Sequence, residues 1–292
     1  MAYDLQVGMV GLRQEVVDSM IKQIAEPSYK MKQALTIIPT SAWKNTFFRE
    51  DPTMSSGPAG NVFKGVPWGA NFPHSDTTWT ELSVRIVKHA VETNIPWEQI
   101  ISGEIDVQAR TIIRRTREIV KSVDDDIWSV LISDATVLTS YAVQTATHGS
   151  WDQTSAAITW DFMNASKLIG DQNYDTSNLI AFVNTTDKRN IMQWFVDKGS
   201  QFPSIATEIA TNGRFGKIGG ITLVESNTVA ASTALIVVPK TCGSWKELVS
   251  LRSELTTDPY KSVRLRIIEE IACELTDPKC VVLIKNTQAG WA

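Results

Sequence analysis

The chain has 292 residues, of which 43% are hydrophobic and 21% charged, and its formal net charge is −4. This length and composition are ordinary for one large or two moderate globular domains with a sizeable apolar core. The negative charge disfavours a protein that wraps nucleic acid tightly, residues 1–11 lack the basic and apolar segments of a signal peptide, and no apolar run is long enough to cross a bilayer.

The first expected element is an amphipathic helix near the N-terminus. Apolar residues recur at helical spacing from Leu12 to Ile24, and Pro27 ends the helix. Its apolar stripe has two interpretations. It packs on the core of its own chain, or it belongs to an arm that docks on a neighbouring subunit. The sequence leaves both open.

Two strand-like segments then flank a long loop. Residues 34–50 and 79–91 have strand composition, whereas residues 51–76 contain four prolines and four glycines, which exclude a regular helix or a central strand. A disordered loop should be poor in aromatic residues. The loop and its flanks instead carry Trp43, Phe47, Phe48, Phe63, Trp68 and Phe72. Such a hairpin has little core of its own, so we expect these rings to contact an adjacent subunit, with a lid over the same subunit as the alternative.

The clearest helix is expected over residues 105–133, where apolar residues follow a 3.6-residue period. Its outer face carries a basic stripe formed by Arg110, Arg114, Arg117 and Lys121. The stripe either faces DNA phosphates or pairs with carboxylates. Asp124, Asp125 and Asp126 follow it. Because consecutive helical residues diverge by about 100° around the axis, we exclude a shared metal ion and expect a solvated helix face.

Helices and short apolar strands alternate after residue 149, which predicts a small α/β block over residues 150–245. Helices are expected at 160–169 and 187–198, and buried strands at 179–183, 221–224 and 234–238. Period-two alternation from Val263 to Leu275 predicts a long half-buried strand. A turn at Asp277 and Pro278 then leads into a last strand at 281–284.

Patterns that indicate catalysis are scarce. The three histidines are scattered, and neither a nucleophile elbow nor a Walker loop is present. The three cysteines (Cys242, Cys273 and Cys280) lack metal-site spacing, so we expect reduced, buried thiols. The glycine-rich residues 213–220 precede a strand, whereas a phosphate-binding loop follows a strand and opens a helix, so a turn is favoured. We therefore expect no enzyme activity, no cofactor and no metal.

The order of these parts is an arm, a long hairpin loop, a long helix, a small α/β block and long terminal strands. It resembles the tailed-bacteriophage major capsid protein family, which has the Hong Kong 97 fold. Residues 219–227 followed by 234–238 are similar to that family's passage of glycine, strand, Ser-Asn, turn and strand in the axial domain. Residues 258–266 and 276–284 are similar to the peripheral-domain strands near the family's C-terminus.

The resemblance implies an α+β, Hong Kong 97-like capsid fold with four parts. These are an N-terminal arm at residues 1–32, an extended β-hairpin loop at 33–92, a peripheral domain with a long spine helix at 93–149 and 246–292, and an α/β axial domain at 150–245. The hairpin loop would lie over an adjacent subunit, and the axial domain would meet its copies around five-fold and six-fold axes.

The resemblance also implies a function. The chain would be a major capsid protein that assembles through hexamers and pentamers into the icosahedral head shell of a tailed virus, enclosing double-stranded DNA by non-specific contact. Separate scaffolding and portal proteins, and a cement or decoration protein, would be its partners, with no membrane involved. It would be made in the host cytoplasm and reside in the virion. Two alternatives remain: an encapsulin-like nanocompartment shell, which shares the fold, and an α/β enzyme that uses the glycine-rich segment.

Overall fold

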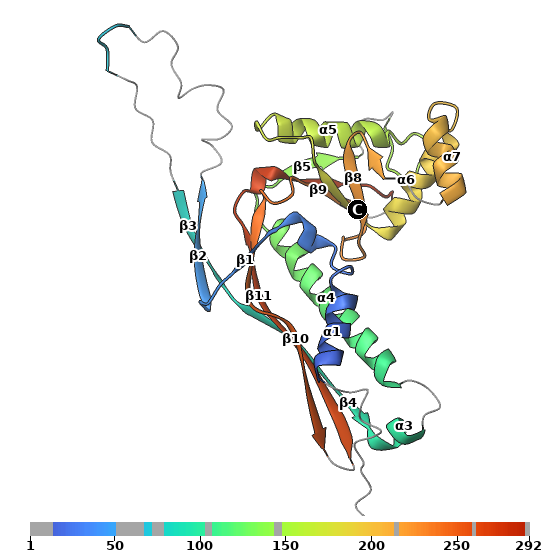
Figure 1. The fold of residues 1–292 in the computed structure, drawn as a ribbon. Coiled ribbons are helices and arrows are strands. Elements are labelled where there is room, and N and C mark those ends of the chain that lie inside the picture. The colour runs from blue at the N-terminus through green and yellow to red at the C-terminus, as the bar shows by residue number, and fades with distance from the viewer. Residues whose placement is uncertain are drawn as a thin grey trace, which may run out of the picture.

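The computed structural model describes residues 14–50, 67–71, 79–102, 107–142, 148–212, 216–258 and 261–289. Figure 1 shows two lobes and a projecting hairpin: an elongated sheet with a long helix along it, and an α/β lobe above. A continuous apolar core joins the lobes, because Phe182 and Leu235 of the α/β lobe pack in the same cluster as Ile127 of the long helix and Ile267 of the elongated sheet.

The elongated sheet has the strand order β1-β10-β11-β4. Its strands are β1 (Thr36–Pro39), β10 (Gly243–Asp258), β11 (Ser262–Leu275) and β4 (Val87–Pro96). Strands β10 and β11 form a long antiparallel ribbon, β4 pairs antiparallel with β11, and β1 pairs parallel with β10. The period-two strand expected from residue 263 is confirmed as β11, which alternates half-buried and buried residues over its first half.

Strand β10 was not predicted from the sequence. Its pairing with β11 shifts register between Glu247 and Val249 and again between Val249 and Arg252. Each such bulge adds a residue to one strand and reverses the faces of the side chains that follow. The apolar residues of this segment therefore do not alternate regularly, and the period that would reveal a strand is lost.

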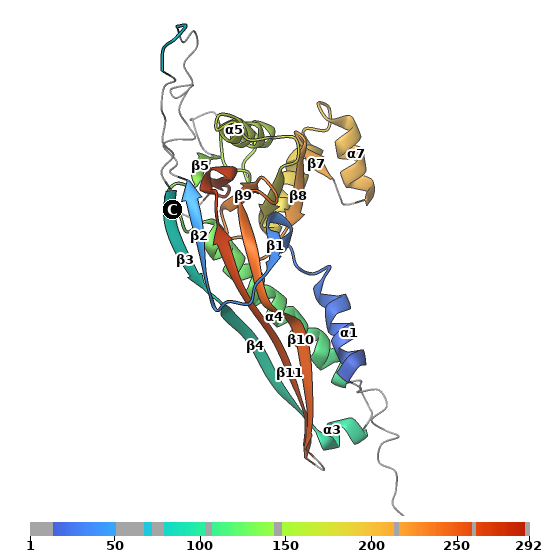
Figure 2. The same ribbon diagram turned by 60° about the vertical axis from the view of Figure 1, so that its left-hand side comes forward.

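The long helix is α4 (Val107–Leu131), close to the expected limits, and Figures 1 and 2 both show it running along the elongated sheet. Beside it lies α1 (Gln14–Ala25), whose Val17, Ile21 and Ala25 are buried in the core of their own chain. Of the two interpretations of the first helix, packing on its own subunit is confirmed. A single 3-10 turn, η2 (Met31–Ala34), continues the chain into β1.

The α/β lobe is built on a six-stranded sheet with the order β5-β12-β9-β6-β8-β7. Its strands are β5 (Leu138–Tyr141), β12 (Val281–Lys285), β9 (Thr233–Val237), β6 (Ile180–Val183), β8 (Ile221–Glu225) and β7 (Lys217–Ile218). The helices of this lobe are α5 (Ile158–Gly170), α6 (Thr185–Asp197) and α7 (Pro203–Asn212), of which α7 was not predicted from the sequence. The short helices α3 (Trp97–Ser102) and η3 (Pro278–Cys280) complete the described elements.

The strand pairings differ from the predicted segment limits in two places. Strand β4, much of which was assigned to the loop, pairs with β11 in the elongated sheet. Strands β5 and β12, assigned outside the α/β block, belong to its sheet, where β12 pairs with β5 and β9. Local sequence patterns do not record which distant strand supplies a hydrogen-bonding partner.

The glycine-rich segment contains a tight turn. Gly219 and Gly220 connect β7 to β8, and both have positive φ, at +55° and +86°. Two residues with positive φ between antiparallel strands match the type I′ hairpin turn that glycine favours. The turn interpretation is thus confirmed for this part, while residues 213–215 lie outside the described ranges. Among the helices described, none is long and apolar enough to span a membrane.

Candidate assembly surface

The projecting hairpin pairs β2 (Lys44–Glu50) with β3 (Trp79–Arg85), in a register that places Phe47 opposite Leu82 and Phe48 opposite Glu81. The expected strand at 34–50 is therefore two strands, β1 and β2, that join different sheets. A lone two-stranded hairpin is marginally stable in water. This one needs support from the rest of the subunit, from another subunit, or from both.

The two faces of the hairpin differ in exposure. Phe47 and Leu82 are half-buried, and the guanidinium of Arg49 lies 6.0 Å from the Phe47 ring. On the other side Phe48 is 60% exposed, and Trp79, which is opposite Glu50, is 57% exposed. Trp43, which precedes β2 at the other end of the hairpin, is 62% exposed. Trp68 is fully exposed. Phe63 and Phe72, also expected at a subunit contact, lie outside the described residues.

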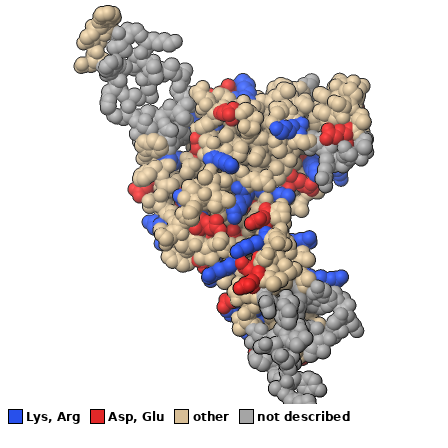
Figure 3. Space-filling view, in the orientation of Figure 1, with Lys and Arg blue, Asp and Glu red and all other residues tan. Residues whose placement is uncertain are grey.

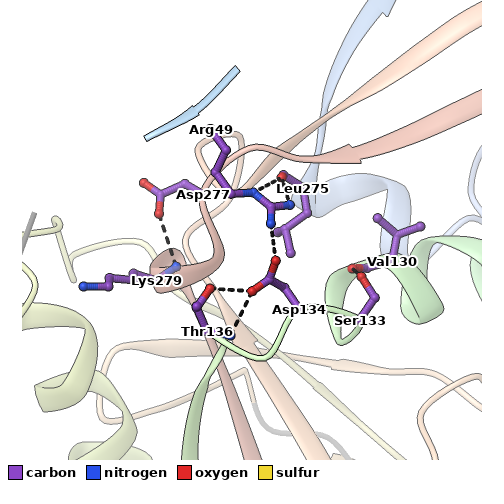
Figure 4. Close-up of polar contacts among 8 residues, drawn as sticks. All are labelled: Arg49, Val130, Ser133, Asp134, Thr136, Leu275, Asp277 and Lys279. Carbon is purple, nitrogen blue, oxygen red and sulfur yellow. Dashed lines mark hydrogen bonds and ion pairs between the residues drawn. The ribbon is translucent and has the colours of Figure 1, made fainter. Parts of the chain in front are cut away.

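Arg49, near the end of β2 that leads into residues 51–78, anchors the hairpin to the subunit (Figure 4). Its Nε and Nη2 donate to the backbone oxygen of Leu275 at 3.2 and 2.6 Å, and its Nη1 pairs with the Asp134 carboxylate. Thr136 donates to the same carboxylate from its backbone nitrogen and its hydroxyl. Burial opposes ionisation of Asp134, but the Thr136 hydrogen bonds and the Arg49 charge outweigh it and hold the pKa below its usual range. The contact joins three segments far apart in sequence.

A second polar contact holds the segment after α1 against β11. The Tyr29 hydroxyl donates to Glu269 Oε2 at 2.5 Å, and Lys32 Nζ lies 3.7 Å from Glu269 Oε1 and 4.8 Å from the centroids of the Tyr29 and Trp245 rings. Glu269 is fully buried at a position of β11 whose neighbours in the same phase are apolar. Burial raises its pKa. This carboxylate makes a directional polar contact at a position where an apolar residue would only add buried apolar surface.

The expectation that residues 124–126 form a solvated helix face is only partly met. Asp125 is exposed as expected, but Asp124 is buried and accepts hydrogen bonds from the backbone nitrogens of Lys30 and Met31, at 3.1 and 3.2 Å. Burial raises its pKa to about 6, against the lowering effect of those hydrogen bonds. The expectation of a solvated face was wrong for Asp124, because the chain that leaves α1 crosses over this turn of α4.

The basic stripe of α4 is exposed at all four positions: Arg110, Arg114, Arg117 and Lys121. Arg114 pairs with Glu118 one turn along the helix, with 3.4 Å between Nε and Oε1. Arg117 and Lys121 border a hollow of about 840 Å³ between α4, residues 27–33 and residues 223–228. The structure therefore divides the stripe, because two of its members face this hollow and the other two do not line it.

The described residues show no arrangement built for metal chemistry. No group of three or more His, Cys, Asp or Glu side chains within them is placed to hold a metal ion. Cys242, Cys273 and Cys280 are free and buried, as expected. Burial raises the pKa of the Cys242 thiol to about 12, which keeps it in the unreactive thiol form at neutral pH.

Comparison with known proteins places these features in context. A family model described as "phage capsid protein" matches residues 79–284, whereas no curated protein sequence matches the chain. The capsid structure of the cyanophage P-SCSP1u has a TM-score of 0.66 at 12% identity, covering 88% of each chain. A phage-related protein from Bordetella bronchiseptica has a TM-score of 0.64 at 13% identity, and the match covers 95% of this chain and 98% of that one. A virus-like particle from Pyrococcus furiosus has a TM-score of 0.61 at 10% identity, and the match covers 93% of this chain and 98% of that one.

Proposed function

Because the chain belongs to the phage capsid protein family, we propose that it is the major capsid protein of a tailed virus and self-assembles into the icosahedral head shell. The predicted family and the α+β, Hong Kong 97-like fold are both confirmed. The shell would consist of hexamers and pentamers of this chain and enclose double-stranded DNA through non-specific contacts. The mature protein would reside in the virion after synthesis in the host cytoplasm.

The observation that carries this proposal is the hairpin. The hairpin is fixed to the subunit by Arg49, while Trp43, Phe48 and Trp79 remain more than half exposed. Fully burying one large apolar side chain contributes about 1.5–3 kcal/mol, so these partly exposed rings offer a few kcal/mol along the length of the hairpin. In a closed symmetric assembly each subunit makes this contact once as donor and once as acceptor, and many such contacts sum to a stable shell.

The proposed roles of the parts follow from this arrangement. The hairpin lies over an adjacent subunit, and the α/β lobe meets its copies around the symmetry axes. The role is structural and requires no catalytic residue. Separate scaffolding and portal proteins, and a cement or decoration protein, are the partners that a closed shell of this kind would use.

Negative-stain electron microscopy of the purified chain, with sedimentation velocity alongside, tests the proposal. Shells, or separate pentamers and hexamers, are the expected species. A strictly monomeric species that does not respond to concentration, salt or an added scaffolding protein would contradict it.

The second candidate is an encapsulin-like nanocompartment shell with a protein cargo, which would share the fold. The similarity to a virus-like particle from Pyrococcus furiosus shows that a chain of this fold forms particles not described as a virus. Particles isolated from the native source and treated with nuclease separate the two functions. Protected double-stranded DNA inside the shell is the outcome for a virus head. A packaged enzyme without DNA is the outcome for a nanocompartment.

A further inference from the structure

One hollow of the described structure lies where three segments meet. Its walls are residues 27–33 after α1, one face of α4, and residues 223–228 at the end of β8, and its volume is about 840 Å³. Figure 3 shows Lys and Arg side chains interspersed with Asp and Glu side chains over α1 and α4, below the α/β lobe. None of the hairpin residues described above lines this hollow.

Four cationic side chains line the hollow against two carboxylates. The cations are Lys30, Arg117, Lys121 and Lys188, and the acids are Asp124 and Glu225. Both acids are already engaged within the subunit. Glu225 pairs with Lys188 at 2.5 Å, and Asp124 accepts the two backbone N–H groups of residues 30 and 31. Among the described residues no ion pair engages Lys30, Arg117 or Lys121, although Lys30 Nζ donates to the backbone oxygen of Pro27 at 3.5 Å. Four cations against two carboxylates leave the hollow with an excess of positive charge.

The wall opposite α4 is held in place by its own hydrogen bonds. Asn184 Nδ2 donates to the backbone oxygen of Val229 at 2.8 Å, and the Thr185 hydroxyl donates to Asn227 Oδ1. The second bond leaves the amide nitrogen of the exposed Asn227 available to donate. A fixed wall with a free amide donor suits a ligand that carries carbonyl oxygens, because binding then orders few side chains of the protein.

We propose that this hollow binds an acidic segment of a partner protein. Aspartate or glutamate carboxylates would pair with Lys30, Arg117 and Lys121, and a backbone carbonyl of the segment would accept from Asn227. Arg117 and Lys121 are four residues apart and so point from the same face of α4, which lets one segment reach both. The inference does not depend on shell formation, since all of its residues belong to one subunit.

A protein segment fits the hollow better than nucleic acid does. Duplex DNA is stiff, with a persistence length of about 150 base pairs, so it cannot bend into a recess within one subunit. Single strands are held by bases stacked on aromatic side chains, and none of the residues that line the hollow is aromatic. An extended peptide is narrow and flexible enough to enter.

Fluorescence anisotropy with a short labelled polyglutamate peptide and the purified full-length chain tests this proposal. The double variant Arg117→Gln/Lys121→Gln should weaken binding by about two- to thirtyfold, since each of the two exposed ion pairs contributes about 0.2–1 kcal/mol. Lys30→Gln, on a different wall, should weaken it in the same direction. Arg110→Gln is the matched control, because Arg110 is exposed on the same helix but does not line the hollow.

All of the exchanged side chains are at least partly exposed, so the thermal unfolding transition should not shift, which separates lost binding from lost folding. A double variant that binds like the wild type, or a control that loses as much affinity, would overturn the proposal. A labelled DNA duplex that binds as tightly and loses as much in the double variant would assign the hollow to nucleic acid, and would overturn it as well.

Discussion

Replacing Arg49 by methionine should loosen the hairpin from the subunit. Arg49 makes two hydrogen bonds to the backbone oxygen of Leu275 and one ion pair with Asp134, and both partners are largely buried. A hydrogen bond to a charged group contributes about 1.5–3 kcal/mol, and a buried acceptor left unpaired costs about 1–3 kcal/mol. Asp134 keeps its bonds from Thr136, which limits the loss. We therefore expect opening of the hairpin to become easier by about 2–4 kcal/mol.

Hydrogen exchange measures this local opening directly, because amides in β2 and β3 exchange at a rate set by the free energy of opening. Since about 1.4 kcal/mol corresponds to a factor of ten, protection of these amides should fall at least tenfold in unassembled Arg49→Met. Protection in β10 and β11 should change much less. Arg85→Met is the control, because Arg85 is an exposed arginine on the same hairpin.

Equal protection of β2 and β3 in Arg49→Met and Arg85→Met would refute the reasoning. The hairpin would then owe its position to the half-buried Phe47 and Leu82 rather than to the guanidinium. A uniform loss of protection across the whole chain would also refute it, because Arg49 would then stabilise the fold globally and not the hairpin in particular.

Three further predictions follow from the same contacts. Tyr29→Phe removes the 2.5 Å hydrogen bond to buried Glu269 and should lower the free energy of unfolding in urea by about 1–3 kcal/mol, whereas an unchanged midpoint would exclude a stabilising role. Burial raises the pKa of Asp124 from 3.8 to about 6, so the folded state binds its proton more tightly; the stability this contributes is present below about pH 4 and is lost as the pH rises through 6. Asp124→Asn should abolish this pH dependence. The free energy of unfolding of the wild type, relative to that of the variant, should therefore fall by up to about 3 kcal/mol from pH 4 to pH 7. Denaturation measured across this pH range tests the prediction, and a constant difference between the two proteins would contradict it. Trp43→Ser/Phe48→Ser should leave the isolated subunit folded by circular dichroism but prevent stable shells in electron microscopy, and full-sized particles would show that these rings are not the contact.

Several elements were predictable from local pattern because each depends on one repeating contact. Helix α4 repeats its apolar residues every 3.6 positions over 25 residues, and the first half of β11 alternates between buried and half-buried residues. The glycine turn between β7 and β8 was predictable because two consecutive positive φ angles exclude most other residues. The exposed aromatic flanks Trp43 and Phe48 were found from composition alone, since a segment rich in glycine and proline cannot bury such rings by itself.

The polar contacts that shape the candidate surface were not predictable in this way. Glu269 occupies an inward position of β11, and the tyrosine that satisfies it lies 240 residues earlier in the chain. Arg49 has no local signal, because its partners Asp134 and Leu275 are far away in sequence. Strand β10 escaped detection because two bulges broke its period.

The amino-acid sequence by itself determined the order of the parts, the long helix, the terminal strand and the aromatic hairpin, because these rest on short-range periodicity and on where apolar side chains can be buried. Only the tertiary structure decided that the first helix packs on its own subunit, that the last strand joins the α/β sheet, and that Lys30, Arg117 and Lys121 surround one hollow. The physical reason is that pairing between distant segments depends on three-dimensional closure of the chain, which no local pattern of residues encodes.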